Sequence, residues 1–282
     1  MYDFKVKSSE GTVYALTDNP NYTLYKIDGL EPPEANVNTS SNATGDGSTV
    51  NSVRLPQRNL VLYMTIEGDV EANRINLYKY FPYKKPIELY YKNDSRNVFI
   101  EGYVERISVG HFDEKQIAQI SIICPQPYFK AVSDLVSYFS EVSSLFTFPF
   151  SISETGIEFS AITTNIRKSI VNTGEVESGV IIELNAIGTV VKPIIYDVFK
   201  RTHLALNFTM EANDKITINT YQGKKSIVLT RNGVDSNAMG YMTPDSHWLT
   251  LDVGDNLFTY DSESGNANLQ LTFTTTAMYG GV

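Results

Sequence analysis

Short runs in which apolar and polar residues alternate recur along most of the chain, and this alternation predicts β-strands. Near the amino terminus the runs are YDFKV, VYAL and YTLYKIDGL, separated by the turn-like segments SSEG and TDNPN. Further along, RNLVLYMTIEG places Leu60, Leu62 and Met64 on one face of a strand. KPIELYY, NVFIEGYVERISVG and KQIAQISIICP continue the pattern, with a hairpin turn expected at Asn93 to Asn97. This half of the chain is therefore expected to be mainly β.

One segment of this half, DVEANRINLYKYFP, has helical spacing instead. Its apolar positions are Val70, Ala72, Ile75, Leu77, Tyr78 and Phe81. Asp69 is suited to the N-cap, and Glu71 places negative charge in the first turn. Lys79 places positive charge in the last turn, and Pro82 ends the helix. These signals predict one short helix.

Residues 31–52, EPPEANVNTSSNATGDGSTVNS, differ from their surroundings because Pro, Asn, Ser, Thr and Gly dominate and apolar anchors are almost absent. This composition predicts a long loop that is mobile in the isolated protein. A loop of this length is either a contact element that orders against a partner or a disordered segment. The sequence leaves both interpretations open.

Residues 128–150 again show helical spacing, at Val132, Leu135, Val136, Phe139 and Val142. Because Pro149 cannot continue a helix, we expect a helix that leads into an extended piece. The remainder of the chain contains many short apolar runs, such as SGVIIELNAIG, DKITINTY and KKSIVLTRNG, separated by Gly, Asn and Asp. Strands at this spacing indicate an antiparallel sandwich or jelly roll.

Composition supports a two-domain β-protein. The 282 residues are 42% apolar and include 18 Tyr and 14 Phe, which favour strands and supply sizeable cores. The formal net charge is −9, the opposite sign to that of a typical nucleic-acid-binding protein. The acidic residues are not gathered in a tail, so they are interpreted first as a source of solubility.

The single cysteine, Cys124, lies in the apolar context SIICPQP and is expected to be a small buried apolar residue. The amino terminus has no apolar signal-peptide core, and no run of about 18 apolar residues predicts a membrane span. We therefore expect a protein that is made in a cytoplasm and has no membrane partner.

Candidate catalytic and metal-binding residues are scattered. His111, His203 and His247 have no His or Cys partner at metal-ligand spacing, so no metal site is expected. A Ser-His-Asp triad stays open, because triads are recognised by geometry, although no G-x-S-x-G sequence occurs. Carboxylate pairs such as Asp113 and Glu114 could be drawn from many acids. No catalytic or cofactor-binding residue is assigned, and no cofactor is expected.

Trp248 opens the segment WLTLDVGDNLFTY and is the only tryptophan. A tryptophan on a β-sandwich can stack against a sugar ring. Here no cluster of Arg, His and Asn surrounds it in the sequence, so packing against the sandwich is favoured over ligand binding.

Several segments occur along the chain in an order that is characteristic of a protein family. RNLVLYMTIEG, NRINLYKYFPYKKPIELYY, VFIEGYVERISVGHF and AQISIICPQPYF occur in the first half, followed by FTFPFSI and GIEFSAI. IVNTGEVESGVIIELNAIGTVVKPII, DKITINTYQGKKSIVLTRNGV and WLTLDVGDNLFTY follow in the second half. Together they cover nearly the whole chain, and in this order the chain resembles the distal tail protein (Dit) family of long-tailed phages and prophages of Gram-positive bacteria.

The resemblance implies a mainly β fold with two domains. Residues 1–130 are expected to form a ring-building belt domain, a β-barrel or sandwich with one short helix. Residues 131–150 would be a connector, and residues 151–282 a galectin-like β-sandwich of jelly-roll type.

The implied function is that of a hub at the phage tail tip, or baseplate. Six copies would form a ring, possibly stacked in pairs, between the tail tube protein and the tail-associated lysin or fibre protein. Receptor-binding or baseplate proteins would attach at its rim, and DNA would be a partner only in transit through the central channel. The implied location is the virion, the implied role is not enzymatic, and the acidic residues could line the channel so that DNA does not adhere.

In such a sandwich the GDN segment would be the turn of a late hairpin, with Asp255 and Asn256 in turn-compatible geometry. Leu249, Leu251, Leu257 and Trp248 would pack inward. The sugar-binding set of a galectin, H-x-N-P-R followed by W-x-x-E, is absent from the chain. The galectin-like fold therefore does not imply glycan binding.

Two other functions compete with the hub. A carbohydrate-binding module that contributes to recognition of the host cell wall would use the sandwich and Trp248, but would leave the first half unexplained. A tail glycan hydrolase would rest only on the abundant carboxylates. A phage-like bacteriocin particle would use the same hub, and the sequence does not separate it from an infectious phage.

Overall fold

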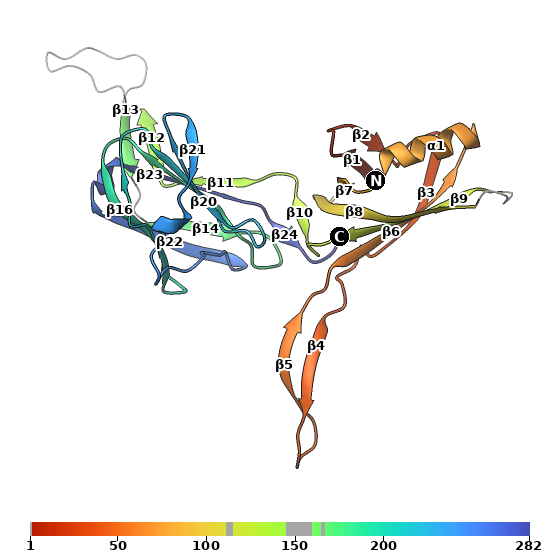
Figure 1. The fold of residues 1–282 in the computed structure, drawn as a ribbon, viewed down its shortest axis with the longest axis horizontal. Coiled ribbons are helices and arrows are strands. Elements are labelled where there is room, and N and C mark those ends of the chain that lie inside the picture. Colours follow the sequence, from red (N-terminus) through yellow and green to blue (C-terminus); the bar gives the residue numbers. More distant parts are fainter. Residues whose placement is uncertain (1, 111–114, 145–159, 165–166) are drawn as a thin grey trace. The chain divides into compact units, whose positions relative to one another are not determined.

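The computed structural model describes residues 2–110, 115–144, 160–164 and 167–282. The chain forms two compact units (Figure 1). The first unit comprises Met1–Val132 together with Met278–Val282, and the second comprises Ser133–Ala277. The last five residues thus return to the first unit, and the segment after Val132 already belongs to the second. The expected boundary between residues 150 and 151 lies outside the described residues.

The first unit contains one helix and eleven described strands, several of them very short. Their bounds are β1 Asp3–Ser8, β2 Val13–Ala15, β3 Tyr22–Asp28, β4 Asn36–Ser41, β5 Ser48–Arg54, β6 Arg58–Ile66, α1 Val70–Tyr80, β7 Pro86–Lys92, β8 Asn97–Val109, β9 Ile117–Cys124, β10 Phe129–Ala131 and β24 Met278–Tyr279. All the pairings between these strands are antiparallel.

Nine of these strands form one sheet, with the main order β2-β1-β7-β8-β9-β6-β3. β10 pairs with β8 and with β24 beside this path. Helix α1 packs against both β1 and β6, although three strands separate them in the sheet. The sheet therefore curves around the helix, and Leu77 and Phe81 enter the core from this side.

The predicted strands of this unit are confirmed. In β6, Leu60, Leu62 and Met64 are fully buried, while the residues between them are partly exposed. The hairpin turn lies between β7 and β8 as expected, and the Asn93 carboxamide oxygen accepts hydrogen bonds from the backbone amides of residues 95 and 96. An Asn that caps its own turn in this way explains why the polar segment marked the hairpin.

The predicted helix is also confirmed. Asp69 is its N-cap, and its carboxylate accepts a hydrogen bond from the Ala72 backbone amide at 3.2 Å. The apolar positions do not all face the core, however, since Ile75 is 47% exposed and the buried side chains within the helix are Asn73 and Leu77. Asn73 is accommodated because its carboxamide donates to the Glu67 carbonyl at 2.7 Å.

The expectation of a loop at residues 31–52 is wrong. Strands β4 and β5 form a two-stranded antiparallel hairpin that projects from the rest of the first unit (Figure 1). Every residue of both strands is exposed. Polar composition argued for a loop, but Thr and Val favour extended backbone, and pairs such as Asn38 with Ser52 hydrogen-bond across the strands at 3.0 Å.

The second unit contains short strands and two 3₁₀ turns. Their bounds are β11 Leu135–Tyr138, β12 Ser140–Ser144, β13 Ser160–Thr164, β14 Arg167–Asn172, β15 Ile181–Ala186, β16 Val190–Asp197, β17 Thr202–Ala205, β18 Thr209–Met210, β19 Lys215–Asn219, β20 Ser226–Arg231, β21 Val234–Asn237, η1 Met239–Tyr241, β22 Gly254–Ser264, η2 Asn266–Asn268 and β23 Leu269–Thr275.

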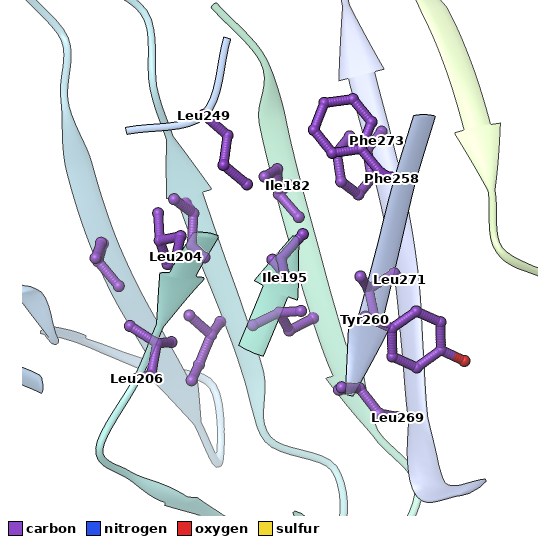
Figure 2. Packing of buried hydrophobic residues seen from close by; sticks show 14 of the residues in the cluster. Ile182, Ile195, Leu204, Leu206, Leu249, Phe258, Tyr260, Leu269, Leu271 and Phe273 are labelled. Carbon is purple, nitrogen blue, oxygen red and sulfur yellow. The ribbon is translucent and has the colours of Figure 1, made fainter. Parts of the chain in front are cut away.

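Two antiparallel sheets make up most of this unit. The first has the order β11-β23-β15-β19-β20-β21, and the second has the order β14-β22-β16-β17, with β18 also paired to β16. Their facing side chains form one core (Figure 2), in which Phe273 contacts Phe258 at 5.0 Å and Phe139 at 5.1 Å between ring centroids. This arrangement is the β-sandwich that the spacing of the strands predicted.

The prediction of a helix within residues 128–150 is wrong for residues 128–144, the part that the structure describes. β10, β11 and β12 occupy this region, and β11 pairs with β23. Of the five positions assigned to a helix face, Phe139 is buried, whereas Val132, Leu135 and Val136 are each more than 40% exposed. The helical spacing of the apolar residues is coincidental. β11 is an edge strand, and an edge strand can carry apolar residues that are not all buried on one face.

The segment WLTLDVGDNLFTY is not a hairpin. β22 begins at Gly254 and pairs with β14 and β16, and Leu251 makes a single bridge to Ser178. Leu249 and Leu251 are buried as expected, but Leu257 is only partly buried. The inward residues of β22 are instead Asn256, Phe258 and Tyr260.

The hydrogen bonds of Asn256 explain why Asn256, Phe258 and Tyr260, and not Leu257, face inward. Its carboxamide oxygen accepts from the Asp252 amide at 2.8 Å, and its amide group donates to the carbonyls of Asp252 and Gly254. Gly254 has a φ of +88°, a conformation that glycine adopts at little cost. A buried side chain thus organises the turn, and the strand that follows starts one residue out of the expected phase.

Candidate assembly interface

The β4–β5 hairpin is exposed at every residue of its two strands, and its two faces differ. In the strand register, Val37 pairs with Val53 and Thr39 pairs with Val50. Paired residues share a face, so these four residues define a valine face. Val53 is 60% exposed. An uncovered row of valines on a projecting ribbon is typical of a protein contact surface.

The opposite face of the hairpin is polar. It carries Asn38 paired with Ser52 and Ser40 paired with Thr49. A β-bulge between Asn38 and Thr39 accommodates Asn51, whose amide group donates to the Ser40 hydroxyl at 2.5 Å. These side chains satisfy one another across the strands, so this face has less to gain from a partner than the valine face.

Strand edges provide a second kind of surface in the first unit. Within the described residues, β2 pairs only with β1, and β3 pairs only with β6, so each leaves one edge of backbone N–H and C=O groups unpaired. A bulge at Tyr25 interrupts β3, and Tyr25 is 53% exposed. Such edges are templates for strands from another chain.

The candidate catalytic residues that the structure describes do not form a Ser-His-Asp triad. His111, Asp113 and Glu114 lie outside the described residues. His203 Nε2 lies 3.1 Å from the Asp245 carboxylate, which is two members of a triad. The neighbouring Ser246 hydroxyl donates instead to the Ala205 carbonyl and accepts from the Ala205 amide. The serine therefore organises the backbone and is not hydrogen-bonded to the histidine.

Cys124 is fully buried in the core of the first unit, as predicted. Burial raises the pKa of its thiol to about 12, so the reactive thiolate is scarce at neutral pH. In the part of the chain that the structure describes, no three His, Cys, Asp or Glu side chains are grouped so that they could hold a metal ion.

Trp248 packs against the core of the second unit, which supports the packing interpretation. The Lys225 ammonium lies 5.4 Å from the centre of its ring, in cation–π geometry. Because the Trp248 ring packs against the core and also lies against the Lys225 ammonium, it is not an open platform for a sugar.

Charge is distributed unevenly between the units. The first unit has 14 Lys and Arg against 16 Asp and Glu, whereas the second has nine against 16. The net charge of −9 is therefore divided as −2 in the first unit and −7 in the second. No helix among the described residues has the length and apolar character needed to cross a bilayer.

The family model described as "Siphovirus-type tail component, C-terminal domain" matches residues 173–276, which lie within the second unit. The sequence matches no curated protein.

The fold extends the likeness to the first unit. The crystal structure of SPP1 Dit, described as a paradigm of the hub of the adsorption apparatus in phages that infect Gram-positive bacteria, aligns with a TM-score of 0.68 and 13% identity. The alignment covers 97% of this chain and 98% of that one.

A chain of the phage P2 baseplate in its activated conformation with Ca aligns with a TM-score of 0.56 and 11% identity over the whole of both chains. The same baseplate with Sr gives 0.54 and 13%, again over both whole chains. The second unit thus matches the C-terminal domain of a siphovirus-type tail component by sequence, and the chain as a whole shares the fold of SPP1 Dit.

Proposed function

We propose that the protein is the ring-forming hub of a phage tail tip, in which the first unit builds the ring and the second unit carries the peripheral proteins. The match of the second unit to a siphovirus-type tail component and the likeness of the fold to SPP1 Dit and a baseplate chain support a structural role in the tail hub or baseplate. The observation that carries the finer proposal is the projecting β4–β5 hairpin, a fully exposed element with one apolar face.

The open strands support a ring of identical subunits. β2 and β3 lie at opposite ends of the main sheet, so β2 of one copy can approach β3 of the next. A head-to-tail contact of this kind closes into a ring when the rotation per subunit is right, and it removes the exposed edges. Six copies are proposed from the family resemblance.

The partners follow from the same proposal. The ring would join the tail tube protein to the tail-associated lysin or fibre protein, and the second unit would receive receptor-binding or baseplate proteins. DNA would pass through the channel, and the virion tail tip would be the location of the protein. The protein would act by assembly, without a catalytic step.

The charge distribution favours another role for the acidic residues than lining the channel. The first unit, which would form the channel wall, is close to neutral by residue count, and the acidic excess lies in the second unit. We therefore propose that the net charge serves solubility and the outer surface, and that a nearly neutral wall lets DNA pass.

The test compares two substitutions at neighbouring positions on opposite faces of the hairpin. Val53→Asp places a charge on the valine face, and Ser52→Asp places the same charge on the polar face. Light scattering after gel filtration, with negative-stain images of the same peak, measures assembly. We expect a six-fold ring for the parent and for Ser52→Asp, and loss of the ring for Val53→Asp.

Both residues are exposed on a projecting ribbon, so both variants should fold with unchanged melting temperatures. A ring that persists in Val53→Asp with parental stability would mean that the valine face is not a subunit contact. A parent protein that never assembles, alone or with a tail tube protein, would contradict the hub itself.

A further inference from the structure

The first unit buries an arginine that has no carboxylate partner among its hydrogen bonds. Arg58 begins β6 and is 2% exposed. Its Nε donates to the Pro127 carbonyl at 2.7 Å, and its Nη1 donates to the carbonyls of Gly29 at 2.5 Å and Glu31 at 2.7 Å. Its Nη2 donates to the Gly280 carbonyl. A buried guanidinium held by four backbone carbonyls fixes the positions of all four.

These carbonyls lie at the root of the hairpin. Gly29 and Glu31 precede β4, and Arg58 follows β5, so the Arg58 side chain ties together the two legs from which the hairpin projects. The packing at Gly29 is close: a Cβ there would lie 2.2 Å from the Asn59 carbonyl oxygen, and its φ is +90°. The two legs therefore touch through backbone as well as through Arg58.

The C-terminal segment, residues 278–282, packs against the same root. The Val282 amide donates to the Leu30 carbonyl at 3.1 Å. Arg96 Nη1 donates to the Gly281 carbonyl at 2.5 Å. With the contact from Arg58, three separate hydrogen bonds hold the last three residues of the chain beside the start of the hairpin.

The other end of this segment is anchored in the second unit. Thr276, two residues before it, donates its amide to the Tyr221 hydroxyl at 2.9 Å and its hydroxyl to the Asp134 carboxylate at 2.5 Å. Both partners belong to the second unit.

The hairpin depends on its root because its strands bury no side chains that would stabilise it. A two-stranded ribbon without a covered face is marginally stable in water, and every residue of β4 and β5 is exposed. We infer that the C-terminal segment is a latch that holds the hairpin root through Arg58. Arg58 is the positioning residue of this latch, and the inference does not depend on the proposed hub.

Two neighbouring glycines allow a matched test. A Cβ on Gly281 would lie 2.8 Å from Pro32 Cδ and 3.1 Å from the Leu30 carbonyl oxygen, so Gly281→Ala pushes the segment away from the root. A Cβ on Gly280 would lie no closer than 3.9 Å to Pro32, so Gly280→Ala is tolerated. Hydrogen exchange followed by mass spectrometry reports the C-terminal segment, the hairpin and the β8–β9 pair in the same sample.

In Gly281→Ala we expect the amides of the C-terminal segment and of β4 and β5 to exchange on the order of tenfold faster, with β8 and β9 unchanged. Gly280→Ala should match the parent. A second variant that ends at Ala277 removes the segment outright and should show the same increase in the hairpin.

Two results would overturn the latch. One is a hairpin that exchanges at the parental rate although the C-terminal segment has been displaced or deleted. The other is an increase that extends equally to β8 and β9, since the first unit would then have loosened as a whole and the hairpin would have no special dependence on the segment.

Discussion

The two units of the chain are recognised by different signals. The second unit is matched by sequence, over residues 173–276, whereas the first is matched by fold alone. The second unit is an acidic sandwich around one large core, and the first is a nearly neutral curved sheet with an exposed hairpin and open strand edges. Core packing demands particular side chains, while backbone edges pair with little regard to sequence. An assembly surface made of edges is therefore easier to detect in the fold than in the sequence.

The largest effect should come from the core of the second unit. Phe273 is fully buried among Phe139 and Phe258, so Phe273→Ala leaves a cavity that costs about 3–5 kcal/mol. Calorimetry should show a large fall in one transition and no change in the other. The neighbouring Thr272→Ala is the control, because Thr272 points away from the core. An equal fall in both transitions would break the comparison, since the units would then unfold as one.

Arg58→Leu is the corresponding test in the first unit. Four backbone carbonyls lose the donor that the buried Arg58 side chain supplies, which should cost about 2–4 kcal/mol and shift only the transition of the first unit. Arg54→Leu removes an exposed arginine from the same leg of the hairpin and should change stability by less than about 0.5 kcal/mol. Similar losses in both variants would mean that the buried hydrogen bonds of Arg58 contribute little.

The free energy of unfolding of the second unit should depend on pH through Asp214. Hydrogen bonds from Arg231, at 2.5 and 2.8 Å, hold the pKa of the buried Asp214 below its ordinary value. Because the folded pKa is depressed, this stabilisation is complete above the ordinary value, about 3.9, and is lost as the pH falls through the folded pKa. Solvent screening reduces this stabilisation, because Arg231 is 37% exposed.

Asp214→Asn should therefore destabilise the second unit at pH 7, and its difference from the parent should shrink as the pH falls below about 4. Urea titrations at several pH values measure this difference. The exposed Asp235→Asn is the control for a general change of charge. A difference for Asp214→Asn that stays constant down to pH 2 would contradict the ion-pair account.

The smallest effect concerns helix α1. Asp69→Ala removes the carboxylate that accepts from the Ala72 amide and should cost about 1 kcal/mol in the first unit. Glu71→Ala removes an exposed pair with Arg74 and should cost less than about 0.5 kcal/mol. Thermal unfolding followed by circular dichroism would distinguish the two, and equal effects would mean that the cap is not specific.

Sequence patterns correctly predicted the elements whose conformation is determined by residues close together in the sequence. The alternation of Leu60, Leu62 and Met64 and the cap at Asp69 each depend on a few neighbouring residues, and the structure agrees with both. The errors arose where the conformation of a segment depends on contacts with residues that are distant in the sequence. β11 was mistaken for a helix because its conformation depends on pairing with β23, more than a hundred residues away.

The hairpin was missed for a related reason. Its strands are stabilised by hydrogen bonds across a turn and by a root that includes the C-terminal segment, and neither is visible in composition. The sequence did hold a partial signal, since GDG marks a turn and Thr49, Val50 and Val53 favour extended backbone. Asn256 illustrates the same limit, because its buried carboxamide shifts β22 by one residue.

The central claim is that the first unit builds a ring and the second unit stands outside it. The most direct measurement is electron microscopy of the purified protein, with its mass determined by light scattering. The account predicts a mass six times the 31.5 kDa of one chain and a six-fold ring whose wall is the first unit, with the sandwiches at the rim. A ring whose wall is formed by the sandwiches, or a protein that stays a monomer even with a tail tube protein present, would contradict it.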